Sequence, residues 1–157
     1  MFTNMKLSEG LAVLAAVDPQ SVAAGTVTTA WFPVLNFHRF LALIGTGALG
    51  ASATVDVKFQ QAQDAAGTGA KDVTGKALTQ LTQAGGASNK QAMIDLNSSD
   101  VDTNNGFGWV RLSMTVGVAA SQAVAYLLGG TPEFAPPRDT SANPVINLGA
   151  ASVVQIV

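Results

Sequence analysis

The sequence contains no cysteine, and this absence excludes several kinds of chemistry at once. Disulfide bonds, thiolate nucleophiles and thiolate metal ligands all require cysteine. Histidine is nearly absent too, because His38 is the single histidine in 157 residues. The chain has neither a paired-histidine metal motif nor a G-x-S-x-G nucleophile motif. We expect His38, which lies between Phe37 and Arg39, to have a packing or hydrogen-bonding role, and we predict a non-enzymatic protein that uses no cofactor.

Charged residues are scarce, at 11% of the chain against roughly 25% in an average soluble domain. Most of the surface must therefore consist of small and amide side chains, and a sparsely charged surface favours association with partners. The net charge is −2 and the eight basic residues are spread along the chain. The sequence lacks the basic patch that is typical of a nucleic-acid binder, so we predict no direct contact with nucleic acid.

Long apolar runs are also missing. No segment approaches the roughly 20 apolar residues that a membrane-spanning helix requires. The N-terminal stretch MKLSEGLAVLAAVDPQS has a lysine followed by an apolar run from Leu11 to Val17. That run is short, and Glu9 and Gly10 stand just ahead of it, which does not suit a secretory signal. The sequence predicts a soluble protein without a membrane partner.

What the chain does contain is a series of short segments in which polar and apolar residues alternate. In ATVDVKFQQ, Val55, Val57 and Phe59 point to one side, as in a half-buried strand. Stretches rich in Gly, Asn, Asp and Ser separate these segments. We therefore predict an all-β fold, an antiparallel β-sandwich or a jelly-roll-like barrel. Strands are expected at residues 26–32, 37–45, 53–61, 90–96, 108–118 and 122–128, and residues 73–82 fit either a weak strand or a helical turn.

The two ends of the chain differ from this central pattern. Residues 1–25 are predicted to form an N-terminal arm or a short helix, and residues 26–130 the sandwich domain. Residues 131–157 are predicted to form a proline-rich exit and a C-terminal arm that ends in the apolar ASVVQIV. Apolar side chains at the ends need cover, as a last strand of the domain or against a neighbouring chain. We predict partner contacts at Leu7, Leu11, Leu14, Val153, Val154 and Ile156.

One polar stretch, DVDTNNG at residues 100–106, resembles the start of a calcium-binding loop. With Asp100 at position 1, Asp102 and Asn104 occupy positions 3 and 5, where an EF-hand places oxygen ligands. The glycine, however, comes one position late, and an arginine stands where the bidentate glutamate belongs. We therefore interpret the stretch as a polar turn. A looser cation site that uses Asp95, Asp100 and Asp102 is the alternative.

Two longer stretches carry a resemblance to a known family. LNFHRFLALIGTGALGASATVDVKFQQAQD joins an apolar strand, a glycine-rich joint and an alternating strand, and GFGWVRLSMTVGVAASQAVAYLLGGTPEFAPP adds a hairpin and an exit with Gly and Pro. In this order, over about residues 26–137, the chain resembles the head decoration or minor capsid (cement) proteins of tailed bacteriophages and related prophages. The insertion at 74–89 and the arm at 138–157 are longer than the family's pattern.

The resemblance implies a non-enzymatic virion structural protein that binds the major capsid protein lattice, other copies of itself, or both. It would be made in the host bacterial cytoplasm and lie on the capsid surface as a homo-oligomer, with a trimer favoured. A cement protein stabilises a shell by mass action because it binds the assembled lattice and not the free subunits. The family has no catalytic residues to transfer. Alternatives are a tail, baseplate or head–tail joining subunit and a carbohydrate-binding β-sandwich.

Overall fold

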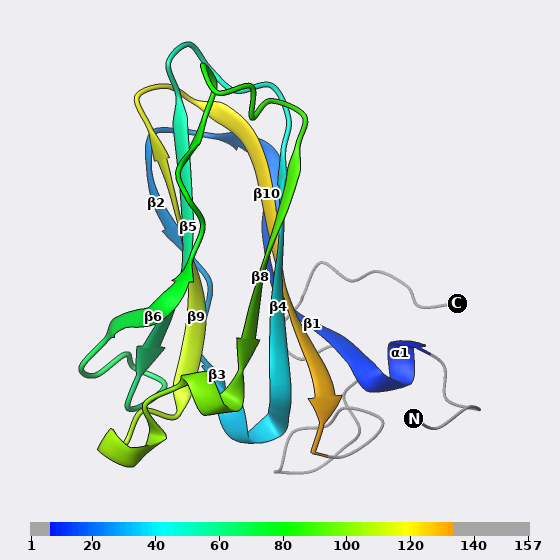
Figure 1. Ribbon diagram of the computed structural model, residues 1–157, viewed down its shortest axis with the longest axis vertical. Coiled ribbons are helices and arrows are strands. Elements are labelled where there is room, and N and C mark those ends of the chain that lie inside the picture. Colours follow the sequence, from blue (N-terminus) through cyan, green and yellow to red (C-terminus); the bar gives the residue numbers. More distant parts are fainter. Residues whose placement is uncertain (1–6, 134–157) are drawn as a thin grey trace.

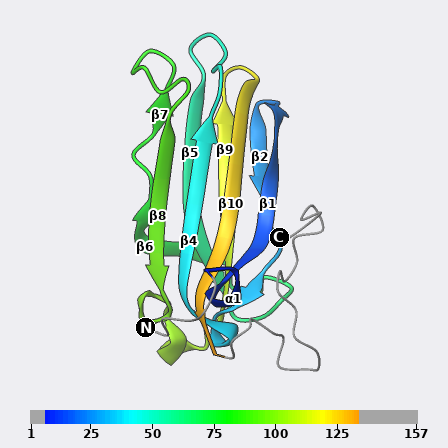
Figure 2. The same ribbon diagram turned by 90° about the vertical axis from the view of Figure 1, so that its right-hand side faces the viewer.

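The computed structural model describes residues 7–133, which form two antiparallel β-sheets packed face to face (Figure 1). The strands of sheet A lie side by side in Figure 2, in the order β1 (Leu11–Val22), β10 (Ser121–Pro132), β4 (Phe37–Thr46) and β8 (Gln91–Asn97). The strand order of sheet B is β2 (Gly25–Thr28), β9 (Trp109–Gly117), β5 (Thr54–Ala62) and β6 (Lys71–Ala77). Two short strands extend sheet B, with β3 (Phe32–Pro33) beside β9 and β7 (Leu81–Thr82) beside β5. The prediction of an all-β antiparallel sandwich is confirmed.

Four short helical segments complete this part of the chain. They are α1 (Leu7–Gly10) and three 3-10 turns, η1 (Val34–Asn36), η2 (Ser98–Asp100) and η3 (Thr103–Asn105). Within residues 7–133, none of them has the length and apolar character needed to cross a membrane.

The core lies between the two sheets. Strand geometry sends every second side chain inward, and in β5 the inward residues are Val55, Val57 and Phe59, as predicted, each at most 1% exposed. Phe37 and Phe40 of β4 add an edge-to-face pair with ring centroids 6.1 Å apart. Full burial of a large apolar side chain contributes about 1.5–3 kcal/mol. The inward residues of both sheets therefore form one continuous core that holds the layers together.

Residues 73–82, for which the sequence allowed either a strand or a helical turn, contain strand structure. β6 ends at Ala77 and β7 begins at Leu81, and both pair with β5. Within β6, Gly75 has a φ of 73°, a conformation that glycine adopts without the steric cost of a Cβ. The break between the two strands is what weakened the alternating pattern in this stretch.

The prediction of an arm or short helix over residues 1–25 differs from the structure. Among the described residues 7–25, only Leu7–Gly10 is helical, and Leu11–Val22 is strand β1, paired with β10 at the edge of sheet A. A shift in register just before Ala15 marks a β-bulge, and Leu14 and Ala15 are both buried. Two consecutive inward residues imitate helical spacing, and this explains why a helix was expected. The sandwich therefore includes this strand.

A second irregularity in β1 accommodates a proline. The register shifts between Val17 and Gln20, and Pro19 lies inside this interval. Proline cannot donate a ladder hydrogen bond, so it is tolerated at bulges and on edge strands. At the other end of the domain, β10 continues to Pro132, past the predicted boundary at residue 130. The rest of the predicted C-terminal arm, residues 134–157, lies outside the described residues.

Candidate interaction surface

Sheet A presents an apolar surface on the side that faces away from the core. Cross-strand partners share one side of a sheet, so the register identifies the members of this surface. Leu43 of β4 pairs with Tyr126 of β10 and with Met93 of β8, and Leu41 pairs with Leu128. We define the outward face of sheet A by its apolar and aromatic side chains, all partly or largely exposed: Leu11, Val13, Ala16, Leu41, Leu43, Met93, Val124, Tyr126 and Leu128.

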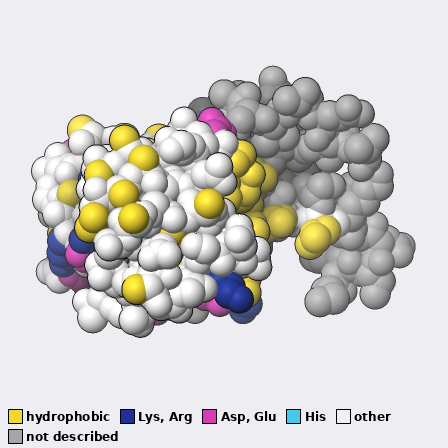
Figure 3. Space-filling view, turned by 90° about the horizontal axis from the view of Figure 1, so that it is seen from above, with side chains coloured by type: hydrophobic (Ala, Val, Ile, Leu, Met, Phe, Trp, Pro, Cys, Tyr) yellow, Lys and Arg dark blue, Asp and Glu magenta, His cyan; other side chains and the backbone are white. Residues whose placement is uncertain are grey.

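The continuity of this face is its unusual property. Single exposed apolar residues are common on soluble proteins, whereas a contiguous apolar patch marks a contact surface. Here the patch extends over all four strands of sheet A, and Met93 on the edge strand β8 is 63% exposed. In the end-on view of Figure 3, one group of hydrophobic side chains lies at the right-hand edge of the described part, on the side where sheet A lies in Figure 1, and others are scattered over the end that faces the viewer. The outward face of sheet A is therefore suited to contact with a partner.

The outward side of sheet B is polar instead. Lys58 Nζ donates to Asp72 Oδ2 at 2.7 Å, and Arg111 donates two hydrogen bonds to Gln60 Oε1 at 3.0 and 2.8 Å. Hydrogen bonds from Lys58 and from Gln60 hold the pKa of Asp72 below its ordinary value. Arg111 also lies over the ring of Trp31, 4.4 Å from its centroid. This is the usual arrangement of an antiparallel sheet with one solvated side, so the two outward sides of the sandwich have different roles.

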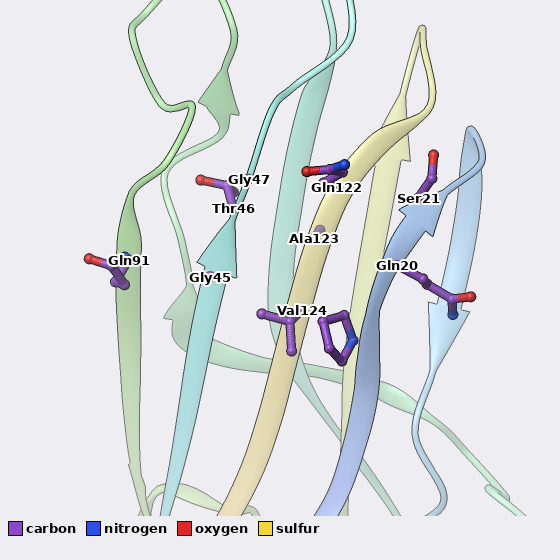
Figure 4. Close-up of a pocket in the computed structure, with 10 residues that line it drawn as sticks. Gln20, Ser21, Gly45, Thr46, Gly47, Gln91, Gln122, Ala123 and Val124 are labelled. Atoms are coloured by element: carbon purple, nitrogen blue, oxygen red, sulfur yellow. The ribbon is translucent and has the colours of Figure 1, made fainter.

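A groove crosses the outward face of sheet A near the loop end of its strands (Figure 4). Two glycines keep it open, because a Cβ on Gly45 would lie 2.9 Å from Val124 Cγ1 and a Cβ on Gly47 would lie 2.8 Å from Gln122 Oε1. Amide side chains line it, and an amide both donates and accepts hydrogen bonds. The groove thus adds polar groups to one end of an apolar surface. All four strands of sheet A contribute to its lining, and the polar side chains include Gln20 and Ser21 of β1, Thr46 of β4, Gln91 of β8 and Gln122 of β10.

The predicted partner-binding residues have different positions in the structure. Leu7 in α1 is 80% exposed, and Leu11 is partly exposed on the outward face of sheet A. Leu14 is 0% exposed and belongs to the core, so its assignment to a partner contact is wrong. Regular alternation along the start of β1 is the reason, since it places Leu14, like Ala12, on the side that faces the other sheet. The three C-terminal residues Val153, Val154 and Ile156 lie outside the described residues.

The stretch at residues 100–106 connects β8 to β9 and includes the turn η3. Its two carboxylates contact different lysines: Lys76 Nζ lies 2.8 Å from Asp100 Oδ2, and Lys71 Nζ lies 2.7 Å from Asp102 Oδ2. These hydrogen bonds are the main reason why the pKa of each aspartate lies below its ordinary value. Asn104 is exposed in η3. Over residues 7–133, no three histidine, aspartate or glutamate side chains come close enough together to hold a metal ion.

His38 has a polar contact and not a packing role. Its Nε2 lies 3.3 Å from Glu133 Oε2, and both side chains are about half exposed. This contact links β4 to Glu133, the residue that follows β10. Strands β10 and β4 are neighbours in sheet A. This geometry agrees with the hydrogen-bonding role that was one of the two roles expected for His38. The contact lies at the C-terminal end of β10.

Sequence reasoning did not identify the outward face of sheet A or its groove. The alternation of side chains divides each strand into two sides but does not say which side is exposed to solvent. From the sequence alone, Leu41 and Leu43 have the character of core residues. A usable signal was present: residues 40–44 of β4 and 123–128 of β10 are apolar or aromatic at every position, whereas residues 54–60 of β5 alternate. An apolar run of this kind is typical of a strand that is covered on both sides.

Comparison with known proteins identifies no family for this chain. No protein-family model matches it, and no curated protein matches it. Among solved structures, a chain in the structure of infectious bursal disease virus (Gt strain) aligns with 81% of this chain at 8% identity and a TM-score of 0.44, and the alignment spans only 33% of that viral chain. A cowpea mosaic virus empty particle aligns with 74% of the chain at 12% identity and a TM-score of 0.40, over 60% of its own length.

A third solved structure is not viral. The disulfide-linked pili of Bacillus endospore appendages align with 83% of this chain and 98% of their own, at 13% identity and a TM-score of 0.39. At these identities and TM-scores the likenesses support no functional conclusion. The sandwich assignment depends on the strand order and register of this chain alone.

Proposed function

We propose that this chain is a non-enzymatic structural protein of a tailed-bacteriophage virion that decorates or cements the capsid. The observation that carries the proposal is the outward face of sheet A, a contiguous apolar surface on a sandwich whose other outward side is polar. A free monomer would leave this surface in water, whereas a subunit of an assembly would bury it. The sequence resemblance over residues 26–137 gives the kind of assembly.

In this proposal the partners are the major capsid protein lattice and other copies of the chain, with a trimer as the favoured homo-oligomer. Sheet B and its ion pairs face solvent. Binding to the assembled lattice and not to free subunits would stabilise the shell by mass action. Several weak contacts in one oligomer would raise the avidity without any single strong contact.

The terminal segments belong to the same proposal. Leu7 is exposed beside β1 and is available to a partner. We assign residues 134–157 to an arm that contacts neighbouring subunits through Val153, Val154 and Ile156. The described residues 11–132 then form the domain that carries the arm.

The test is addition of the purified full-length protein to heads of the encoding phage from which its gene has been deleted. We expect the protein to sediment with the heads and to raise the temperature at which they release DNA. Met93→Glu, which places a charge on the outward face of sheet A, should weaken binding at least 10-fold. The matched control Thr28→Glu, on an exposed residue of sheet B, should bind like the wild type. Heads that neither bind the protein nor gain stability would overturn the proposal, and rings of the isolated protein would instead favour a tail or joining subunit.

The groove favours one alternative, a carbohydrate-binding sandwich. Amide side chains of Gln20, Gln91 and Gln122 can hydrogen-bond sugar hydroxyls, and Tyr126 offers a ring on the same face. A glycan array would show selective binding that Gln122→Ala reduces. A silent array together with head binding would retire this alternative.

A further inference from the structure

We propose that the outward face of sheet A is the binding surface for the C-terminal segment, residues 144–157, of a neighbouring copy of this chain. The inference rests on the proposed structural role, which requires contacts between subunits. The proposed contact joins two apolar partners. One is the outward face of sheet A, and the other is the uncharged C-terminal segment of a second copy.

The size of the face argues for a narrow occupant. Strands lie about 4.8 Å apart and rise about 3.4 Å per residue, so four strands over about seven residues cover about 450 Å². A standard interface buries about 800 Å² on each partner. Two such faces packed against each other would therefore fall short of a stable dimer. An extended segment lying along the face matches these dimensions better.

The sequence of the C-terminal segment suits this surface. PVINLGAASVVQIV contains seven Val, Ile and Leu residues and no charged side chain, so docking would desolvate no ionised side chain of the segment. Fourteen residues in an extended conformation span about 46 Å, which exceeds the length of the face. On the face itself, the row of Leu43, Tyr126 and Met93 is also uncharged, and Asp95 lies beside Leu41 on the edge strand β8. Apolar surface would be removed from water on both members.

The strand that precedes the C-terminal segment offers this segment no free edge. β10 lies between β1 and β4, so both of its hydrogen-bonding edges are already occupied. A segment that follows Pro132 cannot add as a strand beside β10. Pro136 and Pro137 then stand in the sequence, and adjacent prolines favour an extended, stiff chain. We place the segment on a neighbouring copy, whose sheet A offers the same apolar face.

Cross-linking of the full-length protein tests the contact directly. A benzophenone amino acid is placed at position 93, on the outward face, or at position 28, on sheet B, as the control. Normal and ¹⁵N-labelled copies are mixed under dissociating conditions, reassembled and irradiated. We expect position 93 to cross-link to residues 144–157, with about half of these products joining a light to a heavy copy, and position 28 to give none of them.

The other occupants of the face have distinct signatures. Products that join only copies of the same label would mean that each chain covers its own face, and cross-links to another sandwich would mean that two domains pack directly. Either result overturns the proposal, as does the absence of cross-links from position 93. Loss of this contact while the protein still binds heads would leave the virion role standing. If the cross-links confirm the contact but phage heads do not bind the protein, only the proposed virion role would be overturned.

Sedimentation of variants gives an independent measurement. Leu43→Glu and Met93→Glu should weaken self-association at least 10-fold, and Thr28→Glu should not change it. Met93 is 63% exposed at a sheet edge, so its replacement should preserve the β-sheet circular dichroism spectrum even if Leu43→Glu affects folding. Wild-type association of a folded Met93→Glu variant would contradict the proposal.

Discussion

At the scale of single residues, close backbone approach explains several glycines of this chain. A Cβ on Gly129, in the central strand β10, would lie 2.7 Å from Cδ1 of Phe37, which is buried in the core. A contact this short requires the ring or the strand to move. Gly108, just before β9, has no atom within 4 Å of the corresponding Cβ position. The two glycines thus have different tolerances for the same added methyl group.

We predict that Gly129→Ala lowers the free energy of unfolding by about 1–3 kcal/mol, the usual cost of overpacking a core. Gly108→Ala should leave it unchanged or raise it by up to about 1 kcal/mol, because the unfolded chain loses freedom. Urea titrations followed by tryptophan fluorescence measure both. Equal effects of the two substitutions would show that the Phe37 contact is not the cause.

The aspartates of the β8–β9 connection make stability depend on pH. The pKa of Asp100 is lowered from 3.8 in the folded protein, first by the hydrogen bond from Lys76 and then by the Asn97 N–H. A lowered folded pKa contributes stability above the unfolded pKa, and this contribution is lost as the pH falls through the folded pKa. We predict that the free energy of unfolding decreases as the pH is taken below 3.8.

The variant Asp100→Asn should show a smaller decrease over the same acid range, measured by denaturant titration at each pH. Lys76→Met should reduce the decrease as well, because it removes the largest cause of the pKa shift. Added salt should change the acid dependence of the unfolding free energy more in the wild type than in either variant. Identical acid dependence in all three proteins would refute the assignment to this ion pair.

At the scale of elements, β1 shows where the sequence predicted the fold and where it did not. Regular alternation in β5 and β9 predicted those strands closely, because both have one buried and one solvated side. In β1 a bulge and Pro19 interrupt the alternation, and alanines fit a helix as well as a strand. Membership in sheet A was settled by pairing with β10, a contact more than a hundred residues away along the chain. Local pattern carries no information about such a contact.

The revised position of β1 leads to a prediction. Leu14→Ala should lower the free energy of unfolding by about 2–5 kcal/mol, since it leaves a cavity in the core. Leu7→Ala, at a residue that is 80% exposed, should stay within about 0.5 kcal/mol of the wild type. Thermal and urea unfolding of the full-length variants check both values. If Leu14→Ala left the free energy of unfolding unchanged, residues 11–22 would not be part of the core and the prediction of an N-terminal arm would stand.

At the scale of the whole molecule, the two outward sides of the sandwich divide its surface by chemistry. The ion pairs of Lys58, Lys71 and Lys76 lie on sheet B and the connections beside it. The middle of the outward face of sheet A carries leucine, tyrosine and methionine, with Arg39 and Asp95 toward one end of that face. The sequence predicted a surface with few charges and an associating protein. It did not predict which side associates, because the apolar outward residues of β4 and β10 have the composition of a core.

The central claim is that the outward face of sheet A is buried when the protein is assembled in its particle. Hydroxyl-radical footprinting tests it on native side chains: Met93 and Tyr126 report on that face, and Trp109 reports on sheet B. We predict that oxidation of Met93 and Tyr126 falls several-fold between the dissociated monomer and the particle-bound protein, while oxidation of Trp109 stays the same. Unchanged oxidation of Met93 and Tyr126, or protection of Trp109 in their place, would contradict the account.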